Sequence, residues 1–218
     1  MRYLVTGAAG FIGSHLLEAL EAQGHDVVGI DCFTDYYDPA LKEENARGIE
    51  LARLDLAEDE LDFSGVDGVF HLAAQPGVRS FGAVFPLYVR RNLIASQRVF
   101  EAAAAAGTRV VFASSSSVYG NSGTLPRTED QKPDPISPYA VSKIAAEEFC
   151  TSFSRVYDLE TVCLRYFNVF GPRQDPTSQY AAVPAPGRTS TEVQSAFSRN
   201  SRSRPACVHR QRSCGAGW

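Results

Sequence analysis

Short runs of β-branched and other apolar residues alternate along this chain with segments of helical periodicity. The strand-like runs are 2–7, 26–31, 49–56, 67–74, 109–115 and 160–168, and the helical patterns are 11–23, a long segment within 86–106, and 137–157. Continuous apolar strands separated by helices pair in parallel through crossover connections, and helices then cover both faces of the sheet. The sequence therefore predicts an α/β fold built on a doubly wound parallel sheet.

The overall composition is that of a soluble globular chain. Its 218 residues are 44% hydrophobic and 21% charged, with a formal net charge of -4. No apolar run is long enough to span a bilayer, and the first residues form a strand-like run rather than a signal peptide. The mild acidity indicates neither a nucleic-acid nor a membrane-surface partner. Five scattered cysteines without metal-ligand spacing predict no metal site and favour a reducing cytoplasm.

A glycine-rich turn joins the first predicted strand to the first predicted helix. The segment GAAGFIG (7–13) spaces its glycines as GxxGxxG. Glycine there allows a sharp turn and a close approach of backbone N–H groups to a pyrophosphate, and the helix N-terminus favours an anion. An ordinary strand-to-helix turn is the alternative, but the acid that follows favours a dinucleotide and a Rossmann fold. The residues expected to contact the dinucleotide are Gly7, Gly10, Phe11, Ile12 and Gly13.

An acidic residue, Asp31, ends the second predicted strand. Its carboxylate can accept both hydroxyls of the adenosine ribose, whereas a 2′-phosphate would meet like charge. No Arg or Lys directly follows, since the next three residues are Cys, Phe and Thr. We therefore predict NAD rather than NADP, with a solvated loop acid as the alternative interpretation. Asp55 and Leu56 end the third strand and could cap the adenine, although Asp55 could equally be a turn residue.

A tyrosine and a lysine four residues apart begin the last predicted helix, so Tyr139 and Lys143 share one face. A phenol titrates near pH 10, and a nearby ammonium together with a positive nicotinamide ring would favour the phenolate. Such a pair alone is often only a surface feature. Here it follows SSSSVYG (114–120), which ends the fifth strand at the sheet edge where ligands bind. A hydroxyl there and the Tyr–Lys pair make a proton-transfer set that faces the cofactor.

At these residues the sequence resembles the extended short-chain dehydrogenase/reductase family, the nucleotide-sugar epimerases and dehydratases. The matching blocks are VTGAAGFIGSHL (5–16), GIDCFTDYYDPALK (29–42), HLAAQPGVRS (71–80), SSSSVYG (114–120), SPYAVSK (137–143) and LRYFNVFGPRQDP (164–176). They cover nearly all of 1–183. The resemblance implies an NAD-binding Rossmann domain over these residues, a UDP-sugar substrate and, for intact members, a homodimer formed through the long helices.

The same resemblance implies catalytic roles for three residues. Tyr139 is the catalytic base, Lys143 anchors the nicotinamide ribose, and Ser115 matches the family's catalytic Ser or Thr. By the same matching, the backbone of Leu72, Ala73 and Ala74 lies along the cofactor, Asn92 in the long helix binds at the cofactor site and helps order it, and Asn168 contacts the nucleotide sugar. A buried strand end, a helix polar residue and a strand-terminal turn are the respective alternatives. His71 ends a strand in this family and is not expected to act as a base.

The resemblance narrows the reaction. Dehydratases, and the related decarboxylases, place one or two acidic residues after the catalytic Ser or Thr, where this chain has Ser116 and Ser117. Epimerisation at C4 of a UDP-sugar is therefore favoured, with dehydration or decarboxylation as alternatives. The blocks resemble both UDP-glucuronate and UDP-glucose 4-epimerases. Arg79 or Arg173 could hold a sugar carboxylate or a diphosphate, because a guanidinium serves either.

The charge pattern changes near Val183. Residues 184–218 contain six Arg, no Lys and one acid, and they do not resemble the family, whose members continue well beyond this length. We expect 1–183 to be the NAD-binding domain, with the C-terminal substrate lobe truncated. We hypothesise a reading-frame shift after Val183; a genuine disordered basic tail is the competing interpretation. With a frame shift, the sequence would be an incomplete version of an epimerase. With a genuine tail, the chain would be an NAD-binding remnant with poor turnover. A nucleic-acid role for the tail would rest on charge alone.

Overall fold

The computed structural model describes all residues except 37, 78–81, 122–124, 176–207 and 212–218. One sheet runs through the molecule in the strand order β3-β2-β1-β4-β5-β6-β7. Its strands are β1 (Arg2–Thr6), β2 (Asp26–Ile30), β3 (Leu51–Ala52), β4 (Gly68–His71), β5 (Arg109–Ser115), β6 (Thr161–Tyr166) and β7 (Val208–Gln211). The first six pair in parallel and β7 pairs antiparallel with β6. The predicted parallel sheet is thus confirmed.

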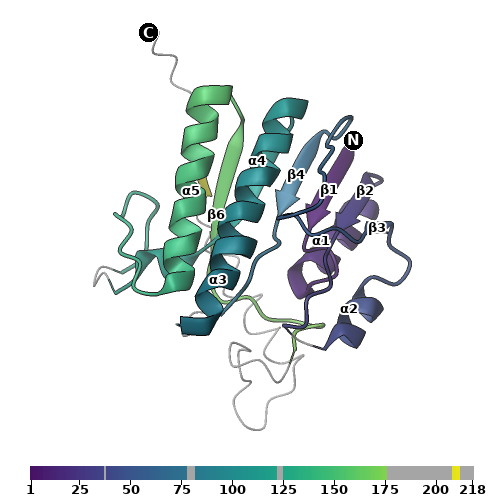
Figure 1. Cartoon of the computed structure of the whole chain (residues 1–218), viewed down its shortest axis with the longest axis horizontal. Helices are drawn as coiled ribbons and strands as arrows, with labels where there is room; N and C mark the ends of the chain where they lie inside the picture. Colours follow the sequence, from purple (N-terminus) through teal and green to yellow (C-terminus); the bar gives the residue numbers. More distant parts are fainter. Residues whose placement is uncertain (37, 78–81, 122–124, 176–207, 212–218) are drawn as a thin grey trace.

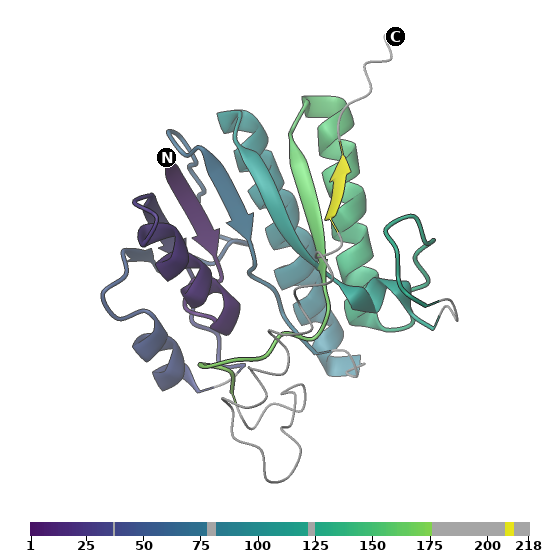
Figure 2. The same ribbon diagram turned by 180° about the vertical axis from the view of Figure 1, so that it is seen from behind.

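Helices lie on both faces of this sheet, as doubly wound connections require. In Figure 1, α3 (Phe85–Tyr88), α4 (Ala95–Ala106) and α5 (Pro138–Tyr157) lie in front of the sheet. Figure 2 shows α1 (Phe11–Glu21) on the opposite face, with the short α2 (Pro39–Asn45) beyond the edge of the sheet. Two 3₁₀ turns, η1 (Gly82–Val84) and η3 (Ser116–Tyr119), and a π-helical segment, η2 (Val89–Ile94), complete the described elements.

Two buried clusters hold the layers together. On the α4 and α5 side, Phe100 and Phe112 are each 1% exposed or less and pack edge to face, with ring centroids 5.8 Å apart. On the α1 side, Val5 of β1 and Leu17 of α1 are fully buried in the second cluster. Burial of such side chains from water is the main favourable term in folding. The strand order places β1 and β4 at the centre, where the chain changes direction across the sheet.

The elements differ from the sequence predictions in four places. The strand predicted over 49–56 has only two paired residues, because Asp55 begins a turn in which its carboxylate accepts the N–H of Ala57. The helix predicted within 86–106 exists, but its first half is the π-helical segment η2. Neither α2 nor β7 was predicted from the sequence. No helix in the described part of the chain has the length and apolar character needed to cross a membrane.

A buried ion pair fixes α5 on β6. Arg165 of β6 donates to both carboxylate oxygens of Glu147, with Nη2 2.7 Å from Oε2 and Nε 3.0 Å from Oε1. The Glu147 and Arg165 side chains are 5% and 6% exposed, so each charge depends on the other for compensation. The hydroxyl of Ser114, at the end of β5, also donates to Glu147. The carboxylate thus joins three elements beneath the carboxyl edge of the sheet.

Glu147→Ala leaves the Arg165 guanidinium buried without its carboxylate. We expect the free energy of unfolding to fall by about 3–5 kcal/mol, measured by urea denaturation. Glu148→Ala, at the exposed neighbouring position on the same helix, is the matched control and should change stability by less than about 0.5 kcal/mol. Equal losses in the two variants would contradict a structural role for the pair.

Candidate active site

Two adjoining cavities lie along the carboxyl edge of the central strands. They share lining residues at the β1–α1 turn, after β2 and after β4, namely Gly7, Gly10, Tyr36, Leu72, Ala74 and Pro76. One extends toward the ends of β2 and β3, and contains Asp31, Asp55, Leu56 and Ala73. The other extends toward β5, α5 and the end of β6, and contains Ser115, Tyr139, Lys143 and Asn168 together with 11–13. Within the described residues, every predicted site residue except Asn92 and Arg173 lines this crevice.

The glycine turn brings three backbone segments closer than side chains would allow. Gly7 has a φ of +71°, and a Cβ there would lie 2.9 Å from the backbone N of Ala73. A Cβ on Gly13 would lie 2.1 Å from the carbonyl oxygen of Gly7, a distance that no Cβ tolerates. The N-cap residue of α1 is Gly10, so no side chain caps the first N–H groups of the helix. This end of α1 therefore presents backbone N–H groups to the crevice, a geometry that suits a pyrophosphate.

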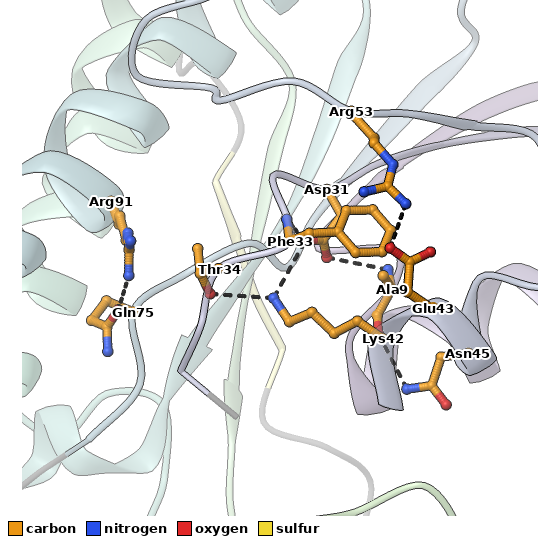
Figure 3. Close-up of polar contacts among 10 residues, drawn as sticks. All are labelled: Ala9, Asp31, Phe33, Thr34, Lys42, Glu43, Asn45, Arg53, Gln75 and Arg91. Atoms are coloured by element: carbon orange, nitrogen blue, oxygen red, sulfur yellow. Dashed lines mark hydrogen bonds and ion pairs between the residues drawn. The ribbon is translucent and has the colours of Figure 1, made fainter. Parts of the chain in front are cut away.

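Asp31 lines the first cavity and is only 7% exposed. Its Oδ2 accepts the N–H of Ala9 at 3.2 Å, and its Oδ1 accepts the N–H of Phe33 at 2.8 Å. The side chain of Lys42 reaches in from α2 to place Nζ 3.4 Å from Oδ1 and 3.2 Å from the hydroxyl of Thr34 (Figure 3). Sequence reasoning missed Lys42 because it considered only the residues directly after Asp31. Asp31 is therefore not a solvated loop acid.

Asp55 is both a turn residue and a residue of the cavity lining. It begins a turn, with Oδ1 2.9 Å from the N of Ala57, and it also lines the first cavity beside Leu56. Arg90 of η2 donates to its Oδ2 at 2.7 Å. Partial burial opposes ionisation, but the hydrogen bonds from Ala57 and Arg90 outweigh it and hold the pKa of Asp55 below its ordinary value. The carboxylate is therefore ionised at neutral pH.

Asn92 lies behind the crevice wall rather than on it. Its Oδ1 accepts the N–H of Gln75 at 2.7 Å, and its Nδ2 donates to the carbonyl of Gln75 and to the Ser142 hydroxyl, at 3.1 and 2.9 Å. At 2% exposure it joins the segment after β4 to α5. Arg91, which does line the first cavity, donates to the Gln75 side chain at 2.6 Å (Figure 3). Asn92 is thus placed to order the site through Gln75.

Ser115, Tyr139 and Lys143 meet at the centre of the second cavity. Ser115 lies close enough to Tyr139 to lower its pKa, and Lys143 places Nζ 5.8 Å from the centre of the Tyr139 ring. Burial raises the pKa of Tyr139 to about 12, against the lowering effect of the Ser115 hydrogen bond. Burial also lowers the pKa of Lys143 to about 8, while the charge of Glu147 opposes that shift. The Lys143 ammonium donates to the carbonyl of Ala113 at 2.8 Å.

Two further contacts orient this group. Ser117 places its backbone N 3.2 Å and its hydroxyl 2.9 Å from the hydroxyl oxygen of Ser115, and both donate to that oxygen. Since a hydroxyl has two lone pairs and one proton, Ser115 is left with its proton to donate on the side away from Ser117. Tyr88 is fully buried with its ring 6.3 Å from that of Tyr139, and its hydroxyl donates to the carbonyl of Gly77. Neither contact could be read from sequence spacing.

The remaining candidates divide by location. Asn168 is exposed and lines the second cavity. Arg173 is held away at α1, where it forms an ion pair with Glu18. Arg79 lies outside the described residues. His71 is completely buried between the hydroxyls of Thr6 and Ser96, at 2.7 and 2.9 Å, and burial lowers its pKa to about 3. A neutral, enclosed imidazole agrees with the prediction that His71 is not a base.

Comparison with known proteins agrees with this geometry. Residues 3–190 match the model of the NAD dependent epimerase/dehydratase family. The chain belongs to that family. An uncharacterised UDP-glucose epimerase of Bacillus subtilis is 42% identical over 191 residues. UDP-glucuronate 4-epimerase 1 of Arabidopsis thaliana is 40% identical over 190 residues. A crystal structure of a Bacillus cereus UDP-glucuronic acid 4-epimerase in complex with UDP-glucuronic acid and NAD superposes with a TM-score of 0.77 at 40% identity.

The chain matches only part of these family members. Each of the two sequence relatives aligns with 81% of this chain, which spans 59% of the bacterial protein and 44% of the plant enzyme. The crystal structure aligns with 82% of this chain, which covers 60% of that structure. The matched portion contains the glycine turn, Asp31 and the Ser–Tyr–Lys group, so the family assignment applies to the part of the chain that holds the crevice.

Gly13→Ala should disrupt the glycine turn, because the added methyl would displace the backbone of Gly7. We expect a loss of about 1–3 kcal/mol in unfolding free energy, measured by urea denaturation, together with weakened NAD binding measured by calorimetry. Gly171→Ala is the control, since its Cβ would meet only Phe11 at an ordinary 3.6 Å. NAD binding unchanged by Gly13→Ala would rule out the close approach at this turn.

The buried ammonium of Lys143 should make stability depend on pH. Its pKa is about 8 in the folded protein against an ordinary 10.5, so the unfolded chain binds more protons between these values and stability rises with pH. Between pH 8 and 10, the unfolding free energy of the wild-type chain should rise by about 2–3 kcal/mol relative to Lys143→Met. Urea denaturation at several pH values tests this, and parallel pH profiles of the two proteins would contradict it.

Proposed function

We propose that this chain carries the NAD-binding and catalytic half of a UDP-sugar 4-epimerase. The observation that carries the proposal is the Ser115–Tyr139–Lys143 group, which lines the same crevice as the glycine turn and Asp31. Relatives at 37–42% identity include UDP-glucose and UDP-glucuronate 4-epimerases. The proposal therefore joins a proton-transfer group on this chain to the reaction named for its relatives.

The residues of the crevice fit a bound NAD. The N-terminus of α1 would hold the pyrophosphate, Asp31 the adenosine ribose, and Lys143 the nicotinamide ribose. Gly7 lines both cavities and lies so close to the backbone of Ala73 that a side chain there would have no room. Leu72 and Ala74 line both cavities and would contact the cofactor along its length, with Asp55 and Leu56 at the adenine end.

Tyr139 would accept the proton of the sugar C4 hydroxyl, with Ser115 hydrogen bonded to the same oxygen. Burial holds the pKa of Tyr139 at about 12, so nearby positive charge is needed to form the phenolate at neutral pH. Lys143 supplies part of that charge, and Ser115 also lowers the pKa of Tyr139. When bound, NAD supplies the acceptor and later the donor of the C4 hydride. Tyr139 returns its proton as the opposite C4 configuration forms.

Epimerisation is favoured over elimination by the residues beside Ser115. Ser116 and Ser117 occupy the positions where the family's dehydratases and decarboxylases have carboxylates, and the Ser117 hydroxyl is engaged with Ser115. A serine hydroxyl is too weak an acid or base at neutral pH to replace them. Dehydration or decarboxylation remains the alternative reaction. Asn168, exposed at the second cavity, is the candidate contact for the nucleotide sugar, and Arg79 the candidate for a carboxylate or diphosphate.

We also propose that 1–183 is the family domain and that 184–218 is a basic segment outside it, produced by a reading-frame shift. The composition change near Val183 supports this, as does the partial coverage of the relatives. Resequencing the gene from the codon of Asp175 tests the frame. An open frame that continues the family sequence would support it. A confirmed in-frame tail would instead favour the NAD-binding remnant with poor turnover.

Two broader predictions concern the assembly of the chain and its cellular compartment. Exposed apolar side chains on α3, η2 and α5, namely Phe85, Ile94 and Val141, are consistent with a homodimer formed through these helices. Among the described residues, Cys32, Cys150 and Cys163 are free thiols, as expected in a cytoplasmic protein. We propose that this chain forms a homodimer and that it is cytoplasmic.

Tyr139→Phe should lower the rate of C4 epimer formation from UDP-glucuronate or UDP-glucose by at least about 10²-fold, because the proton acceptor is lost. Proton NMR of the sugar H4 follows the conversion. Tyr157→Phe is the matched control, since Tyr157 ends the same helix and is 63% exposed. An unchanged rate in Tyr139→Phe would refute the assignment.

Thermal shifts separate the epimerase from the remnant. A chain that forms a working substrate site should be stabilised by NAD and stabilised further by UDP-glucuronate or UDP-glucose. A response to NAD alone would favour the remnant, and a response to neither ligand would overturn the proposed function.

A further inference from the structure

The adenosine end of the crevice contains a buried ion pair whose cation comes from an unpredicted helix. Lys42 and Asp31 are 5% and 7% exposed, and both line the first cavity. Nζ of Lys42 lies 3.4 Å from Oδ1 of Asp31 and 3.2 Å from the Thr34 hydroxyl. A ligand group at Asp31 would therefore meet a carboxylate and an ammonium together, and not an isolated negative charge.

The position of Lys42 is fixed by several contacts of α2. Asp38 caps the helix by accepting the N–H of Ala40 at 2.9 Å, and Nδ2 of Asn45 donates to the carbonyl of Ala9 at 3.1 Å. Ala9 itself lies in the glycine turn and donates to Asp31. The helix that carries Lys42 is thus attached to the same turn that would hold the pyrophosphate (Figure 3). The ammonium is part of the built wall of this cavity.

The carboxylate of Asp31 has little remaining capacity for hydrogen bonds. Its two oxygens offer about four acceptor sites, and donors from Ala9, Phe33 and Lys42 already use three. A ribose hydroxyl can take the remaining site, but a phosphomonoester, with a charge near -2, would be repelled. If the carboxylate were neutralised, the Lys42 ammonium would be a buried cation without its anion. That arrangement is costly and favours an incoming anion.

We infer that Lys42 gives this cavity the cation needed to bind a 2′-phosphorylated dinucleotide, and that only the carboxylate of Asp31 prevents such binding. This inference rests on the proposed NAD site. Asp31 sets the sign of the preference, and Lys42 supplies the cation that a 2′-phosphate would use. Loss of the single carboxylate therefore changes the class of dinucleotide that binds, with no new positive residue needed.

The test is a double-mutant cycle on the 218-residue chain, with Kd values for NAD and NADP measured by calorimetry. Wild type should prefer NAD. Asp31→Asn keeps the shape of the side chain and should reverse the preference, by about tenfold or more in favour of NADP. Lys42→Met should strengthen the preference for NAD by about tenfold. The double variant Asp31→Asn/Lys42→Met should show little preference, since neither charge remains.

Arg53→Met is the matched control. This guanidinium lies 3.9 Å above the Phe33 ring in the same region, but it pairs with the exposed Glu43 and does not line the cavity (Figure 3). Its removal lowers the positive charge of the region without altering the proposed contact, so the ratio of the two Kd values should stay unchanged. A shift as large as that in Lys42→Met would show a general charge effect and overturn the inference.

The outcomes separate this inference from the proposed function. If wild type binds neither dinucleotide, the proposed function fails and this inference fails with it. If wild type binds NAD but Asp31→Asn gains no NADP binding, or if Lys42→Met leaves the ratio of Kd values unchanged, only this inference fails. Asp31→Ser provides a second neutral variant if Asp31→Asn does not fold, as judged by its urea denaturation curve. The NADP preference of the neutral variant should also weaken as salt screens the ammonium.

Discussion

The close approach of backbone at the β1–α1 turn is the constraint on which the site depends. Gly13 allows α1 to begin directly against Gly7, and Gly7 in turn lies against the backbone that follows β4. Any side chain at these two positions would separate α1 from the central strands. The N-terminus of α1 would then move away from the crevice, and the crevice would lose the backbone donors that suit a pyrophosphate. The charged groups on either side are useful only because this turn places them along one continuous groove.

A second constraint is the buried charge around α5. Lys143 and Glu147 lie one turn apart on this helix, and Glu147 is held by Arg165 of β6 and by Ser114 of β5. The Glu147–Arg165 pair fixes the orientation of α5, and so it also fixes where Lys143 and Tyr139 enter the crevice. The low pKa of Lys143 arises from burial, with Glu147 as the opposing influence. The buried ion pair that positions α5 and the Tyr139–Lys143 pair on that helix therefore belong to one network of contacts.

Sequence reasoning performed best where chemistry follows from local pattern. The strand and helix order, the glycine turn, Asp31 and the Tyr139–Lys143 spacing all depend on residues close together in the chain. It failed where contacts join distant residues. The spacing of Lys42 relative to Asp31 carries no helical or strand signal, and only the fold of α2 brings the two together. The π-helical segment that contains Asn92 likewise gives no periodicity distinct from that of an ordinary helix.

Lys42 also shows how a local rule for cofactor choice should be stated. An acid at the end of the second strand predicts NAD because it repels a 2′-phosphate, yet the repulsion depends on all charges at that point and not on one residue. Here the fold brings in the ammonium of Lys42, eleven residues after Asp31 in the chain. A rule based on the residues directly after the acid does not include it. The carboxylate still excludes the phosphate, since the ammonium is committed to it and to Thr34. The preference for NAD is therefore a balance between two buried charges, in which the carboxylate of Asp31 sets the preference and the ammonium of Lys42 weakens it.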